Sequence, residues 1–342
     1  MTNESEIEHI VEAIDRFTPK PGITKELSQN IAKVEYGDLP SDVISSVKAT
    51  LLNTIGHMAS GSTAKSSRIA MHYIRAIGGK PEATCIHYGD RTSICNAALA
   101  NGAFCFGLEL PDLSRPEQGY GGSVVPAALA ICEVEMANGH ELITSVAIGL
   151  EVALRLASAF PDLPSKRPLN PISTFGPFGA AVAAAKILRM DSSGTENAIS
   201  CCPAQAAGTM QSSFTGGDSA RLVAGFAASY GLKAASMARR GISGARDMLE
   251  GRAGFFMCIA GLNSDGNPKF DLDEVNEGFG EKWNLLNARS GTLEDAKAVC
   301  ERLLVQAAIP QERRHAVFDV VNNLEDEDDM TKLLSSLITK GG

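Results

Sequence analysis

The sequence of 342 residues has little of what nucleic-acid-binding and membrane proteins need. Its 31 Lys and Arg residues face 40 Asp and Glu residues, for a formal net charge of −9, and no basic stripe runs along the chain. Such a chain is a poor match for phosphates or an anionic membrane surface. No uninterrupted apolar run reaches the ~18 residues of a membrane span, and the acidic N-terminus lacks the pattern of a secretory signal. We therefore expect a cytoplasmic protein with no nucleic-acid or membrane partner.

Residues that carry metal and nucleotide chemistry are equally scarce. The eight cysteines form no Cys-x-x-Cys pair, which predicts buried, reduced thiols. The six histidines include none in residues 88–139 or 141–314, and no two lie at metal-ligand spacing. The chain has no P-loop, no Gly-x-Gly-x-x-Gly fingerprint and no Gly-x-Ser-x-Gly elbow. The sequence thus predicts neither a metal nor a cofactor, and it disfavours serine-hydrolase chemistry.

What the chain does contain is small and apolar residues at helical spacing, with 44% hydrophobic residues and 33 glycines. Ala and Gly at this density let helices approach closely, so we predict a mainly α fold, an Ala- and Gly-rich helical bundle. The expected segments are a lead-in at 1–22, a helical domain at 23–262, a tether at 263–291 and C-terminal helices at 292–342 that pack back on the helical domain. Within them, we expect helices over 41–61, 62–77, 92–108, 126–137, 140–159, 174–190, 195–210 and 219–240.

The stretch from Asn101 to Ala130 is the expected location of the site. An apolar helix breaks at Pro111, and a loop carries Glu109, Asp112 and Arg115 to the sequence Gly-Tyr-Gly-Gly at 119–122. Because glycine permits backbone angles closed to other residues, this turn could bring backbone amides close to a ligand. An Ala-rich helix is then expected to begin at Pro126. A solvated surface loop with a tight turn is the alternative interpretation.

This stretch, with its sequence GGSVVPAALA, resembles the central segment of the MmgE/PrpD family. The family includes 2-methylcitrate dehydratase, cis-aconitate decarboxylase and iminodisuccinate epimerase. The resemblance covers roughly residues 25–285 and implies the family's helical domain, two copies of which pair as a homodimer. Four further segments carry the likeness: LPSDVISSVKATLLNTIGHMASG (39–61), GHELITSVAIGLEVALRLA (139–157), TFGPFGAAVAAAKILRMD (174–191) and GISGARDMLEGRAGFF (241–256).

The chain also departs from the family. Members usually carry a second α/β domain after the position of Trp283, whereas this chain passes from Asn284 almost directly to segments that resemble the family's closing helices. We therefore expect this lid domain to be absent. The family's two active-site histidines fall on Gly119, beside Tyr120, and on Asn170, and its lysine falls near Ser212. The family's acidic positions fall on Glu109 and Asp112.

These positions define the candidate site. The expected catalytic residues are Tyr120, Glu109, Asp112 and Arg115. The expected substrate-binding residues are Phe106, Asn170, Ser173, Phe175, Gln205, Met210, Ser212 and Phe214. Local capping or surface solvation is the alternative role for each polar residue among them.

Three functions fit this set. The preferred hypothesis is a cofactor-independent cyclase or isomerase of an apolar small molecule in secondary metabolism, such as a Diels–Alder-type ring closure, because positioning and one or two hydrogen bonds can accelerate such a step. The second is a dehydratase or decarboxylase of a small carboxylic acid, with Glu109 or Asp112 as base and Arg115 and Arg221 as carboxylate binders. The third is a non-catalytic binding or dimerisation protein, in which loss of the catalytic residues is expected.

Overall fold

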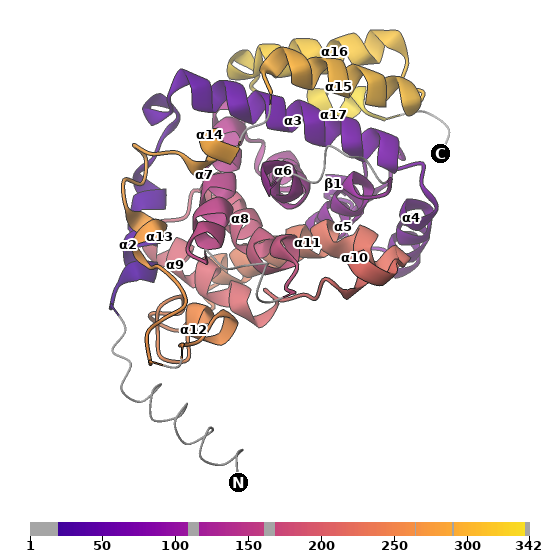
Figure 1. Ribbon diagram of the computed structural model, residues 1–342. Helices are drawn as coiled ribbons and strands as arrows, with labels where there is room; N and C mark the ends of the chain where they lie inside the picture. Colours follow the sequence, from indigo (N-terminus) through magenta and orange to yellow (C-terminus); the bar gives the residue numbers. More distant parts are fainter. Residues whose placement is uncertain (1–19, 109–115, 161–167, 264, 289–290, 339–342) are drawn as a thin grey trace.

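The computed structural model describes residues 20–108, 116–160, 168–263, 265–288 and 291–338 (Figure 1). Within these residues the protein is mainly α-helical, as predicted, and its one sheet pairs β1 (Ala83–Thr84) antiparallel with β2 (Arg91–Thr92). The longer helices are α2 (Ile23–Lys33), α3 (Ser41–Gly61), α4 (Lys65–Ile77), α5 (Ile94–Cys105), α6 (Pro116–Glu135), α7 (Gly139–Ser158), α8 (Pro171–Ile187), α9 (Ser192–Cys201), α11 (Val223–Arg239), α15 (Leu293–Gln306) and α16 (Gln311–Asn322).

Shorter helical segments connect these elements. They are η1 (Tyr36–Asp38), η3 (Cys202–Ala204), α10 (Gln211–Thr215), η4 (Asp218–Leu222), α12 (Phe255–Ile259), α13 (Asp273–Asn276), α14 (Asn284–Ala288), η5 (Leu324–Asp326) and α17 (Thr331–Ser336). No helix in the described part of the chain is both long enough and apolar enough to cross a membrane.

Helix α8 lies at the centre of the core, where it packs against α6, α7 and α11 (Figure 1). Small residues make these contacts close. A methyl group at Gly149 of α7 would lie 2.7 Å from the carbonyl oxygen of Gly179 on α8, and one at Gly231 of α11 would lie 2.6 Å from that of Pro177. Such separations are shorter than atoms in contact tolerate, so glycine is required at both crossings.

Helix α6 corrects the predicted course of the chain. The expected glycine turn at 119–122 and the expected helix start at Pro126 are both wrong, because α6 already begins at Pro116 and contains all of these residues. None of the glycines has a positive φ. They serve close packing instead: methyl groups at Gly121 and Gly122 would lie 2.9 Å from Thr54 Oγ1 and from Phe106 Cε2.

The predicted helix over 195–210 is also shorter than expected. Helix α9 ends at Cys201, and the chain tightens into η3 before leaving the helix. Pro203 explains this end, because it has no N–H to donate to the carbonyl of Ile199. The chain after η3 is therefore no longer part of this helix, and it passes the first turn of α8.

The C-terminal helices lie over α3, where α15 packs closely enough that a methyl group at Gly56 would lie 3.1 Å from Cys300 Cα (Figure 1). Residues 289–292 alone separate α14 from α15, too few for a folded domain. The segment before them is fixed by a buried ion pair on α7. Arg155 Nε donates to Glu151 Oε1 at 2.6 Å, Glu151 accepts from the backbone amide of Leu285, and Arg155 donates to the carbonyl of Lys282.

Candidate functional site

The first turn of α8 is where the elements around the candidate site meet. Asn170 caps this helix: its side-chain Oδ1 accepts from the Ser173 backbone amide at 3.1 Å. The backbone amide of Asn170 donates to the Gly208 carbonyl at 2.9 Å. A methyl group at Gly208 would lie 2.6 Å from Ser173 Cβ, and one at Gly119 of α6 would lie 3.2 Å from Ile172. The start of α8 therefore lies between the start of α6 and the 205–215 segment.

Tyr120 lies in the first turns of α6, and its side chain is only 2% exposed. Burial raises the pKa of its phenol well above the ordinary range, so the hydroxyl remains a neutral hydrogen-bond donor. Its backbone carbonyl accepts from Ser123 Oγ at 2.9 Å. The structure therefore places Tyr120 in the core on a rigid helix, and not on the flexible turn expected from the sequence.

Phe106 and Arg221 lie next to each other, at the end of α5 and in η4. Phe106 caps the C-terminal end of α5, and its ring packs on α6 at Gly122. Its backbone carbonyl lies 3.5 Å from Nη1 of Arg221, which donates to it. Arg221 is partly buried at the last turn before α11, so a guanidinium group stands beside the end of α5.

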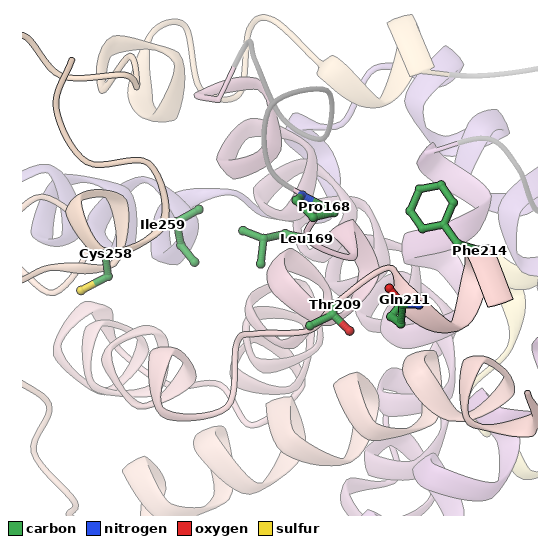
Figure 2. A pocket seen from close by; sticks show the side chains of 7 residues that line it. All are labelled: Pro168, Leu169, Thr209, Gln211, Phe214, Cys258 and Ile259. Carbon is green, nitrogen blue, oxygen red and sulfur yellow. The ribbon is translucent and has the colours of Figure 1, made fainter. Parts of the chain in front are cut away.

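A pocket of about 610 Å³ opens on the other side of the first turn of α8 (Figure 2). Leu169 forms an antiparallel bridge with Thr209 across its floor, and Phe214, which is 74% exposed, stands at one end. Cys258 and Ile259 of α12 lie at the opposite end in Figure 2. The pocket lining, which is largely apolar, is Pro168, Leu169, Thr209, Gln211, Phe214, Cys258 and Ile259.

The structure separates the predicted substrate-binding residues into different environments. Phe214 lines the pocket, whereas Phe175 is 2% exposed and packs among core aromatic rings, 5.6 Å from that of Phe160. Gln205 is exposed after η3. Met210 and Ser212 are partly exposed around the start of α10, and both use backbone groups locally: Met210 donates to Pro168, and Ser212 accepts from Gly216.

Several pocket residues are not predicted from the sequence. Leu169 and Thr209 each adjoin a predicted residue, so their position beside Asn170 and Met210 was a usable signal. Cys258 and Ile259 come from an apolar helix far along the chain, and no local pattern distinguishes them from core residues.

The acidic residues expected to supply chemistry, Glu109 and Asp112, lie outside the described residues, as does Arg115. In the sequence, these three residues lie between the end of α5 and the start of α6. Among the described residues, no cluster of three or more His, Cys, Asp or Glu side chains could hold a metal ion. The described part of the site thus offers a phenol, a guanidinium group, helix N-termini and an apolar pocket.

Comparison with known proteins gives a consistent result. The chain is 30% identical over 284 residues to the cis-aconitate decarboxylase-like protein oryM of Aspergillus oryzae, an alignment covering 80% of this chain and 58% of that protein. It is 27% identical over 281 residues to a cis-aconitate decarboxylase of Aspergillus terreus, covering 79% and 56%. It is 28% identical over 241 residues to the human cis-aconitate decarboxylase, covering 68% and 49%.

The chain therefore spans about half the length of these relatives. A family model, that of the MmgE/PrpD N-terminal domain, matches residues 25–265. This match extends from α2 past α12 and includes every element around the candidate site. By both its relatives and this match, the chain belongs to the MmgE/PrpD family.

Proposed function

We propose that this protein is a cofactor-independent lyase, a decarboxylase or dehydratase of a small carboxylic acid. The observation that carries the proposal is the similarity to three relatives named for cis-aconitate decarboxylation or likeness to it, along alignments of 241 to 284 residues. The connection between α5 and α6, with its two carboxylates, falls within the matched family domain.

The reaction needs few groups. In a dehydration, a carboxylate of Glu109 or Asp112 takes a C–H proton beside a substrate carboxyl group, and the electron pair forms a double bond as hydroxide leaves, protonated to water. In a decarboxylation, the C–C bond to a carboxylate breaks, CO₂ leaves, and the electron pair left on the substrate is protonated by the same acidic group. Neither sequence of steps requires an oxidant or a reductant.

Arg221 and Tyr120 supply electrostatic contributions to this scheme. Arg221 stands beside the end of α5, where the acidic connection begins, and a guanidinium group binds carboxylates through paired N–H donors. Tyr120 lies where that connection ends. Because burial raises its pKa, it can donate a hydrogen bond to developing negative charge without losing its proton.

The relatives support a lyase better than a cyclase. The named relatives carry a decarboxylase name, and nothing among them points to ring closure. The pocket beside Phe214 is the feature that would favour an apolar substrate, because its lining is mostly hydrophobic. We also infer a cytoplasmic location, which fits eight cysteines that are all free thiols.

The test is a substrate panel with the purified full chain. Cis-aconitate, 2-methylcitrate and an apolar polyene are incubated separately, and products are identified by mass. The proposal predicts loss of CO₂ or water from one of the acids and no change in the polyene. Isomerisation of the polyene with no reaction of either acid would restore the cyclase hypothesis, and binding without turnover would favour a non-catalytic protein.

A further inference from the structure

One outer face of the helical bundle is apolar and has no covering element among the described residues. We call it the α4–α11 face. Helix α4 exposes Ile69, Tyr73 and Ile77 at four-residue spacing, so that all three project from one side, and their exposed fractions are 55%, 55% and 49%. Helix α11 exposes Phe226 and Met237, at 43% and 52%. Large apolar side chains gathered in this way mark an interaction surface.

Helix α5 makes the two rows one surface. It packs against both α4 and α11, and the side-chain amide of Asn96 donates to the Gly78 carbonyl at the end of α4 at 2.9 Å. Cys95 and Leu99 of α5 are only partly buried in the strip between the two rows. A partner on this face would therefore meet apolar side chains from three neighbouring helices.

The charge of the face is opposite to that of the chain as a whole. Neither α4 nor α11 contains an Asp or Glu residue, although the protein has a net charge of −9. Three cations at its borders pair with nearby carboxylates. Arg68, Lys233 and Arg240 are exposed and have no carboxylate partner in the part of the chain that the structure describes. The face thus calls for an acidic, amphipathic occupant.

The N-terminal segment of this chain, residues 1–19, has this chemistry. Its sequence MTNESEIEHIVEAIDRFTP carries five acidic residues and one arginine. Its apolar residues recur at helical spacing, which predicts one apolar side with acidic residues around it. These apolar residues are Ile7, Ile10, Val11, Ile14 and Phe17.

The position of Lys20 decides which copy the segment can reach. Lys20 pairs with Asp273 of α13, beside α2, and Figure 1 shows α2 and α4 on opposite sides of the molecule. A helix over residues 4–17 would be about 20 Å long, whereas a compact chain of this size is roughly 50 Å across. From Lys20, the segment as a helix is therefore too short to cover the α4 row of its own chain, whereas the α4–α11 face of a second copy can receive its whole length.

We propose that residues 1–19 of one copy dock as an amphipathic helix on the α4–α11 face of a second copy, with the exchange made reciprocally in a twofold homodimer. This proposal names the surface and the occupant of the dimer that the family resemblance leads us to expect. It is independent of the proposed lyase activity. Isologous exchange buries both apolar faces and places acidic side chains beside Lys233 and Arg240 in each half.

Charge reversal tests the exchange directly in the full chain. Variant one carries Glu8→Lys and Glu12→Lys, and variant two carries Lys233→Glu and Arg240→Glu. Each variant alone sets like charges together, so we expect dimerisation at least tenfold weaker than in the wild type by sedimentation velocity. In an equimolar mixture both contacts become complementary, and the dimer should return. Lys25→Glu with Lys269→Glu, which reverses two exposed charges elsewhere, is the matched control and should dimerise normally.

Cross-linking identifies the partners. Wild-type chains labelled with ¹⁴N and ¹⁵N are mixed and treated with a carbodiimide, and mass spectrometry locates peptides joining residues 1–16 to Lys233. The proposal predicts cross-links of mixed isotope. Three outcomes would each overturn the proposal. The first is cross-links only within single-isotope copies, and the second is a wild-type chain that stays monomeric at micromolar concentration. The third is a mixture of the two reversed variants that stays monomeric although circular dichroism shows that both are folded.

Discussion

The ion pair on α7 and the first turns of α6 and α8 use buried polar groups in opposite ways. Glu151 and Arg155 are almost fully buried, and each is satisfied by the other and by backbone groups of the segment over 274–285. At the site, the described polar groups cap helices or join loops, and the phenol of Tyr120 is buried without a charge. The buried charges on α7 therefore maintain the fold, whereas the chemistry we propose depends on carboxylates in the connection between α5 and α6.

The ion pair should give the largest effect on stability. Arg155→Met leaves Glu151 as a buried carboxylate with backbone donors alone, and breaking such a pair typically costs about 3–5 kcal/mol. Urea unfolding measures the loss. As a control, Lys297→Met removes a partner of the largely exposed Glu294 and should change the unfolding free energy by less than about 1 kcal/mol. If both variants unfold at the same urea concentration, the α7 pair does not have the role assigned to it.

Tyr120→Phe should give the next largest effect, and on turnover. The change removes one hydroxyl while keeping the ring, and loss of a preorganised donor predicts a fall of roughly ten- to a thousandfold. Because burial keeps the phenol neutral, wild-type turnover should not lose this contribution at pH 10, near the ordinary pKa of about 10. His140→Gln, at an exposed residue stacked on Tyr36, is the control. Equal activity of Tyr120→Phe and wild type would remove Tyr120 from the mechanism.

The crossing of α5 and α11, which holds Phe106 beside Arg221, should be sensitive to a single methyl group. A methyl at Gly225 would lie 2.3 Å from the Leu99 carbonyl oxygen, so Gly225→Ala should destabilise the fold by about 1–3 kcal/mol or more. Gly37→Ala is the matched change, because no atom lies within 4 Å of its new methyl group. Thermal unfolding of the two variants compares them, and similar midpoints would contradict the close crossing.

Chelation should give the smallest effect. Dialysis against EDTA, or addition of nicotinamide cofactors, is expected to leave turnover unchanged, because the sequence has no metal or nucleotide motif and the described residues contain no metal-binding cluster. A loss of turnover restored by one added metal ion would show that the site has been misassigned.

Sequence patterns predicted the helices well where periodicity and caps agree. The expected helix over 140–159 is α7, and Asn138 with Glu141 forms a capping box at its start. The pattern is misleading at α6, where glycines that suggest a turn instead allow neighbouring helices to approach closely. A single sequence does not distinguish these two uses, since the neighbouring helix comes from elsewhere in the chain.

The site shows the same limit. The resemblance pointed to the start of α8, and Asn170 is there, but as a helix cap. Phe175 and Phe214 have similar local sequences around them, yet one is in the core and the other on the pocket rim. Cys258 and Ile259 reach the pocket only through the folding of the chain after α11. Tertiary packing decides these cases, and no residue pattern encodes it locally.

The most direct test of the proposed chemistry is release of labelled CO₂ from ¹³C-cis-aconitate by the wild type and by the Glu109→Gln/Asp112→Asn variant. We predict release by the wild type and a fall of about 10²–10⁴-fold in the variant, the usual contribution of a general acid or base. Glu294→Gln, which changes an exposed carboxylate, should match the wild type. Release that is undiminished in the double variant would contradict the assignment of the catalytic carboxylates to the connection between α5 and α6.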